Sequence, residues 1–141
     1  AYGEWRKYIM SFGLGQKLCA DFTSEVSGSI PTQEYYDKVY KTQNWRWTYI
    51  MSLSIGQGEL LMTPLQLANM AAVVANRGYY MTPHIVRPSG VITNKVEKHA
   101  TPIDAKHFEI AVDGMEFAVK NGTARNAMID SVIVCGKTGT V

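Results

Sequence analysis

The stretch from Thr63 to Gly78 constrains the fold most, because it carries a complete set of helix signals. Thr63 is a good N-cap, Pro64 suits the first helical position, and Gln66 completes a capping box at the third. Gly78 supplies a C-terminal stop. Between these signals the apolar residues keep helical spacing and predict a buried stripe of Leu67, Met70, Ala71, Val74 and Ala75. We therefore predict a helix of about 14 residues that packs on a core.

Other segments predict further helices and extended chain. Gly3 to Phe12 has a one-sided apolar face and predicts a helix that ends at Gly13. Asp104 is a good cap for a helix from Ala105 to Lys120, with a core stripe of Phe108, Ala111, Val112, Met115, Ala118 and Val119. Residues 79–87 and 132–140 are typical of extended chain, whereas residues 35–41 suit either a short helix or irregular structure.

The composition describes one globular domain. The 141 residues include 46% apolar and 18% charged residues, and the net charge of +2 is too small to argue for a nucleic-acid partner. Trp45, Trp47 and Tyr49 alternate with polar residues, as in a base-stacking platform, but a half-buried strand or extended loop is the better interpretation. We find no run of 18 apolar residues, which a membrane-spanning helix would need.

The two cysteines, Cys19 and Cys135, leave open whether a disulfide forms. Cys135 lies within an apolar run, which predicts a small buried thiol. The three histidines are widely spaced and do not form a ligand pattern with the cysteines. We therefore predict no metal and no cofactor.

The triplet Gly136-Lys137-Thr138 is compatible with two chemistries. A phosphate-binding loop needs a glycine five positions earlier, where this chain has Ser131. The β-branched residues that lie between favour a strand that leads into Gly136. The pattern therefore argues against a phosphate-binding loop. The alternative, a strand that faces the substrate of an acyl-transferring serine enzyme, stays open at this point.

Three stretches carry a family resemblance when they are taken together: residues 54–59 (SIGQGE), residues 63–68 (TPLQLA), and residues 122–125 (GTAR) followed by 136–140 (GKTGT). In this order they resemble the transpeptidase domain of the class B penicillin-binding proteins, above all the elongation-type penicillin-binding protein 2. The likeness covers nearly the whole chain, since it extends to residues 12–16 (FGLGQ), 27–31 (SGSIP), 76–80 (NRGYY) and 82–85 (TPHI).

The resemblance implies an α/β (α+β) fold of the penicillin-binding transpeptidase and serine β-lactamase type. Members carry a Ser-x-x-Lys motif with the nucleophile, then Ser-x-Asn, then Lys-Thr-Gly. Neither of the first two motifs occurs in this chain. We therefore expect residues 1–141 to be the C-terminal middle portion of a transpeptidase domain, with helices packed on an incomplete antiparallel sheet. The portion would begin after the first two motifs and end just after the third.

The resemblance also implies the chemistry of the third motif. Lys137 would give a positive charge to the substrate carboxylate, and Thr138 and Thr140 would give hydroxyl groups. Gly139 would let the substrate lie close to the strand, and the backbone N–H of Thr140 would be one donor of the oxyanion hole. Gln57 either faces the cleft or bonds only to backbone in its tight loop. We leave both interpretations open.

The whole protein is thus expected to cross-link peptidoglycan stem peptides that end in D-Ala-D-Ala, and to be a target of β-lactams. It would act with the cell-elongation machinery, on the periplasmic side of a bacterial inner membrane, with its anchor outside these residues. The alternatives that remain are a division-type class B protein, a serine β-lactamase, and a non-catalytic penicillin-binding sensor domain.

Overall fold

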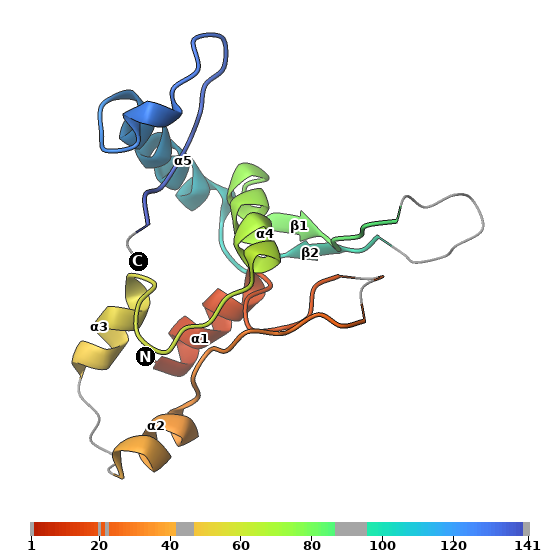
Figure 1. Cartoon of the computed structure of the whole chain (residues 1–141), viewed down its shortest axis with the longest axis vertical. Coiled ribbons are helices and arrows are strands. Elements are labelled where there is room, and N and C mark those ends of the chain that lie inside the picture. Colours follow the sequence, from red (N-terminus) through yellow and green to blue (C-terminus); the bar gives the residue numbers. More distant parts are fainter. Residues whose placement is uncertain (1, 20, 22, 42–46, 87–95, 140–141) are drawn as a thin grey trace.

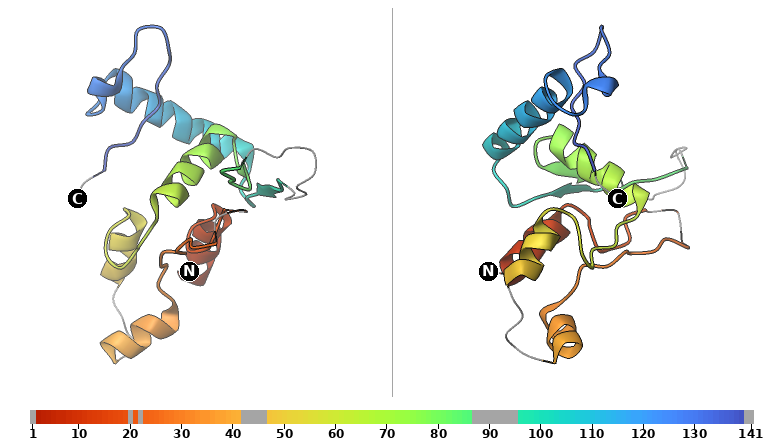
Figure 2. Two further views of the ribbon diagram at one scale, coloured as in Figure 1. Left: turned by 45° about the vertical axis from the view of Figure 1, so that its right-hand side comes forward. Right: turned by 60° about the vertical axis from the view of Figure 1, so that its left-hand side comes forward.

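The computed structural model describes residues 2–19, 21, 23–41, 47–86 and 96–139. The elements follow in the order α1 (Tyr2–Ser11), α2 (Gln33–Tyr40), α3 (Trp47–Ser54), α4 (Pro64–Ala75), β1 (Tyr79–Met81), β2 (Lys98–Ala100), α5 (Ala105–Lys120) and the 3-10 turn η1 (Arg125–Ala127). Helix α4 lies between α5 and α1 in every view (Figures 1 and 2). The helices predicted around residues 3–12, 63–78 and 105–120 are confirmed.

The sheet consists of two short antiparallel strands among the described residues. Tyr79 of β1 pairs with Ala100 of β2, Tyr80 with His99, and Met81 with Lys98. The expected combination of helices with a partial antiparallel sheet is therefore confirmed, and the sheet is small.

The corner between α4 and β1 explains why this hairpin lies against α4. The Arg77 N–H donates to the Val74 carbonyl at 3.1 Å, and the Gly78 N–H donates to the Val73 carbonyl at 2.9 Å. These two bonds form a Schellman motif, with Arg77 in the left-handed region at φ 60°. Gly78 lies so close to Phe108 of α5 that a Cβ atom would be 2.8 Å from its ring. The predicted stop is correct, and both Arg77 and Gly78, the latter at φ 111°, have positive φ.

Two clusters of buried side chains form the core. One joins Leu18, Val73, Tyr80 and Phe108 between α4, the hairpin and α5. The other joins Tyr2 of α1, Tyr36 of α2 and Leu53 of α3. The second cluster fixes the elements that surround the loop after α3, which carries Gln57.

The buried face of α4 differs from the predicted stripe. Val74 is half-buried against the first core cluster, as predicted, but Leu67 and Met70 are 49% and 37% exposed, and Ala71 and Ala75 are exposed too. The buried residues are instead Val73 and two amides, Gln66 and Asn69. The Gln66 side chain donates to the carbonyls of Gln16 and Ser27, both at 2.8 Å, and the Asn69 side chain donates to that of Phe12 at 2.8 Å. The stripe was wrong because these amides satisfy loop carbonyls that helical periodicity does not reveal.

Two opposite substitutions test which face of α4 is buried. Gln66→Leu keeps the side-chain volume but removes the bonds to Gln16, Ser27 and the Thr63 N–H. We expect it to lower the free energy of unfolding by about 3 kcal/mol, at about 1 kcal/mol for each bond lost. The opposite exchange, Leu67→Gln, should change it by less than about 1 kcal/mol because that site is half exposed. Urea unfolding of the 141-residue chain measures the free energy of unfolding of both variants. A larger decrease for Leu67→Gln than for Gln66→Leu would show that the predicted stripe is the buried face.

Three further expectations are settled by the described residues. The extended structure preferred for the aromatic stretch is wrong from residue 47 onward, where α3 begins. A helix forms because Tyr49 and buried Leu53 are four residues apart and so lie on one helical face. The ring of Tyr49 stacks on that of Tyr40, with 4.5 Å between the ring centroids. Trp45 lies outside the described residues.

The segment of residues 35–41, which the sequence left undecided, belongs to helix α2, and Thr32 caps this helix by accepting from the Tyr35 N–H. On α5, Phe108 and Val119 are buried as predicted, but Ala111 is exposed.

Candidate active-site segment

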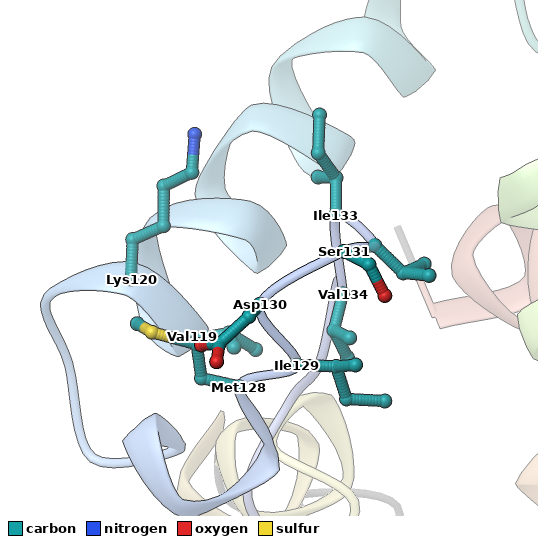
Figure 3. A pocket seen from close by; sticks show the side chains of 9 residues that line it. Val119, Lys120, Met128, Ile129, Asp130, Ser131, Ile133 and Val134 are labelled. Atoms are coloured by element: carbon teal, nitrogen blue, oxygen red, sulfur yellow. The ribbon is translucent and has the colours of Figure 1, made fainter.

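The segment that carries Lys137 leaves α5 through a tight turn. After η1, Ile129 and Val132 form an isolated antiparallel bridge, and residues 128–134 fold back over the end of α5. Together with Val119 and Lys120 they line a hollow of about 400 Å³ (Figure 3). Farther along, the Gly136 N–H donates to the Met115 carbonyl at 3.1 Å and fixes the segment to α5.

Residues 133–139 form no ladder with any other strand in the described part of the chain. The prediction of a strand leading into Gly136 is therefore not met within these residues, since a strand needs a partner and β1 and β2 pair only with each other. Exposure still alternates along the segment: Val134 and Gly136 are half-buried, whereas Ile133, Cys135 and Lys137 are exposed. This period of two is that of extended chain with one face on α5.

The alternation also corrects the prediction for Cys135. Its thiol is exposed, because the half-buried face belongs to Val134 and Gly136. Cys19 is half-buried and its thiol donates to the Asp21 carboxylate at 3.1 Å, and no disulfide joins it to Cys135. Cys135 therefore lies on the same face of the segment as Lys137.

The predicted site residues Lys137, Thr138 and Gly139 lie together and are all exposed. The ammonium group of Lys137 donates to the Thr138 carbonyl at 2.6 Å. A Cβ atom at Gly139 would meet no atom within 4 Å, so packing within this chain does not demand glycine there. Thr140, the expected oxyanion-hole donor, lies outside the described residues.

Gln57 lies on a separate loop with an exposed side chain. The loop continues the C-terminal turn of α3, where the Gly56 N–H donates to Leu53 and the Gln57 N–H to Ser52, both at 3.0 Å. Gly56 and Gly58 on either side have φ of 80°, a conformation that suits glycine. In Figures 1 and 2 the segment of residues 133–139 runs away from α5, toward the side of the molecule that holds the loop after α3. Among the described residues, however, no hydrogen bond joins Gln57 to Lys137 or Thr138.

Two carboxylates that bind hydroxyl or backbone N–H groups of distant segments were not singled out from the sequence. Glu59 accepts from the hydroxyls of Tyr36 at 2.9 Å and Tyr40 at 3.3 Å. Burial, and then the bond to this carboxylate, raise the pKa of Tyr36. Asp21 accepts from the backbone N–H groups of Ile85 and Val86 at 2.7 to 3.0 Å, and these bonds lower its pKa to about 2. Only the position of Glu59 directly after the Gly-Gln-Gly loop could have drawn attention to it.

Neither a metal site nor a membrane span emerges from the part of the chain that the structure describes. No three His, Cys, Asp or Glu residues there are placed to hold a metal ion. None of the described helices is long and apolar enough to cross a bilayer.

Residues 2–141 match the sequence model of the penicillin binding protein transpeptidase domain. The chain belongs to this family. Two similar relatives are named peptidoglycan D,D-transpeptidase MrdA. The protein from Acinetobacter baumannii is 31% identical over 97% of this chain and 21% of its own length. The protein from Escherichia coli K12 is 30% identical over 97% of this chain and 22% of its own length. The chain thus spans about a fifth of these relatives.

Solved structures of the family have the same fold. Penicillin-binding protein 2 of Pseudomonas aeruginosa, in complex with WCK 5153, matches with a TM-score of 0.72 at 31% identity, over 84% of this chain and 28% of that one. A protein from Burkholderia ambifaria described as a peptidoglycan glycosyltransferase matches with a TM-score of 0.74 at 23% identity, over 98% of this chain and 40% of that one, and supports the fold alone. The resemblance to class B penicillin-binding proteins is therefore confirmed.

Proposed function

We propose that the whole protein is a serine-type peptidoglycan D,D-transpeptidase. The observation that carries the proposal is the exposed segment Lys137-Thr138-Gly139, in a chain that matches the transpeptidase family over residues 2–141. A cation followed by a hydroxyl group and a glycine on accessible backbone is suited to binding the carboxylate end of a peptide. The relatives named MrdA support the same activity.

The reaction would be an acyl transfer in two steps. A serine oxygen attacks the carbonyl carbon of the penultimate D-alanine, and the terminal D-alanine leaves with the proton on its amine. The amine of a neighbouring stem peptide then attacks the ester, and the serine regains its proton as the new peptide bond forms. The serine would come from a Ser-x-x-Lys motif, which is absent from these residues.

The third motif would orient the substrate for both steps. The Lys137 ammonium would pair with the terminal carboxylate and exchange its bond to the Thr138 carbonyl for that partner. The Thr138 and Thr140 hydroxyls would donate to the same carboxylate. The open space at Gly139 would admit the peptide backbone, and the Thr140 N–H would stabilise the oxyanion. Gln57 would border the cleft from the loop after α3.

The proposal extends to where and with what the protein acts. We place the domain on the periplasmic side of a bacterial inner membrane, within the cell-elongation machinery that determines cell shape. Its substrates would be D-Ala-D-Ala stem peptides and its inhibitors β-lactams, as the match to the penicillin binding protein transpeptidase family suggests. Residues 1–141 would form the portion of the domain between the second motif and the end of the third.

Covalent labelling by a fluorescent penicillin tests the proposal. The whole protein should take up one label that survives denaturation, because β-lactams resemble acyl-D-Ala-D-Ala and acylate the serine. The isolated 141-residue chain is the control, and it should stay unlabelled since it has no Ser-x-x-Lys motif. An unlabelled whole protein would refute the proposal, while rapid loss of the label would indicate a β-lactamase.

A further inference from the structure

The side chain of Glu59 joins the loop after α3 to helix α2. Its two carboxylate oxygens have separate partners: one accepts from the Tyr36 hydroxyl at 2.9 Å and the other from the Tyr40 hydroxyl at 3.3 Å. Tyr36 is fully buried, and its ring packs edge-on against that of Tyr2 of α1, with 6.0 Å between the ring centroids. Tyr40 stacks on Tyr49 of α3 at 4.5 Å. The carboxylate is therefore held by two aromatic rings that the core itself fixes.

The Gly56-Gln57-Gly58 turn is fixed at both ends. On one side, the N–H groups of Gly56 and Gln57 complete the last turn of α3. On the other side comes Glu59, and two residues later Leu61 exchanges backbone bonds of 2.7 and 3.0 Å with Ser29. Between these anchors the two glycines would move freely, because glycine restricts the backbone least. The carboxylate bonds therefore limit the movement of the one exposed side chain in the turn, that of Gln57.

We propose that Glu59 is a positioning residue for acylation, which acts by holding the turn so that Gln57 meets the substrate beside the Lys137 segment. The inference rests on the proposed function. It selects the interpretation in which Gln57 faces the cleft. The course of residues 133–139 toward the side of the loop after α3 supports this interpretation (Figures 1 and 2). Misplacement of a positioning group by about 1 Å costs up to about a hundredfold in rate. The two bonds from tyrosine hydroxyls to Glu59 are therefore expected to affect the rate of acylation.

The test uses the whole protein and the second-order rate constant of acylation by a fluorescent penicillin. Glu59→Gln keeps the side-chain size but removes the charge and replaces one accepting oxygen with a donor. Both charge-assisted bonds are lost, and one tyrosine hydroxyl must turn to accept from the amide. We expect the substitution to lower the rate constant about tenfold. Tyr40→Phe removes only the 3.3 Å bond and should have a smaller effect in the same direction. Tyr35→Phe, on the same helix but exposed, is the matched control and should change nothing.

The decisive comparison repeats Glu59→Gln in a Gln57→Ala background. If Glu59 acts through Gln57, Gln57→Ala alone slows acylation and Glu59→Gln then adds less than about a twofold loss. Equal losses in both backgrounds, or no effect of Gln57→Ala alone, would overturn the inference. A purely structural role would lower the thermal midpoint and leave the rate constant of the folded protein unchanged. Failure of the proposed function is distinguishable, because the parent protein itself would then not be acylated.

Discussion

Lys137→Ala in the whole protein is expected to slow acylation by penicillin about a hundredfold, the scale of losing one charged group that orients the reacting carbonyl. The ammonium group is exposed, and it bonds within the chain only to the adjacent Thr138 carbonyl among the described contacts. Its removal therefore takes no packing from the fold. A loss of rate would come from the carboxylate that the substrate and the β-lactam share.

The matched control for this prediction is Lys106→Ala. Lys106 is an exposed lysine at the start of α5 and pairs with Asp104 at 3.1 Å. The net charge of the variant changes by the same amount, but exposed ion pairs contribute little, so acylation should be unchanged. Similar losses from the two substitutions would mean that Lys137 acts only through the overall charge, and that the site lies elsewhere.

The sequence predicted those parts of the fold that are encoded locally. The bounds of α5 agree with the prediction, and the capping box of α4 forms with both of its bonds. In each helix the cap and the apolar spacing lie within a few residues of one another, so a single segment contains the information. Thr32 is a further local cap that could have decided in favour of α2.

What could not be predicted depends on contacts between distant parts of the chain. Gln66 is buried because of carbonyls 50 and 39 residues away, and Asn69 because of one 57 residues away. Helical spacing is blind to such partners, so it predicts the wrong face of α4 as the buried one. The bonds to the Glu59 carboxylate could not be predicted for the same reason, since Tyr36 and Tyr40 lie 23 and 19 residues earlier in the chain.

In the candidate site, too, the local pattern could be predicted and the distant contact could not. Lys137, Thr138 and Gly139 are contiguous, and the pattern of residues alone is sufficient to single them out. The exposed face of Cys135 was not predictable, because it follows from the contact of Gly136 with Met115 on α5. An apolar run alone indicates an extended chain but does not say which of its faces is covered.

Formation of the cross-link tests most directly whether the whole protein joins two stem peptides. The donor is a stem pentapeptide that ends in D-Ala-D-Ala, and the acceptor is a second stem peptide with a free amine. A donor that lacks the terminal D-alanine is the control, because it has no leaving group. Pretreatment with penicillin should abolish the reaction, since it would occupy the same serine.

The measured quantity is the amount of cross-linked product relative to the D-alanine released, followed by mass spectrometry. We expect cross-linked product with one D-alanine released for each new bond, no product from the control donor, and none after penicillin treatment. A protein that binds penicillin covalently but forms no cross-link from the pentapeptide would be a sensor domain, and that result would contradict the proposed transpeptidase activity.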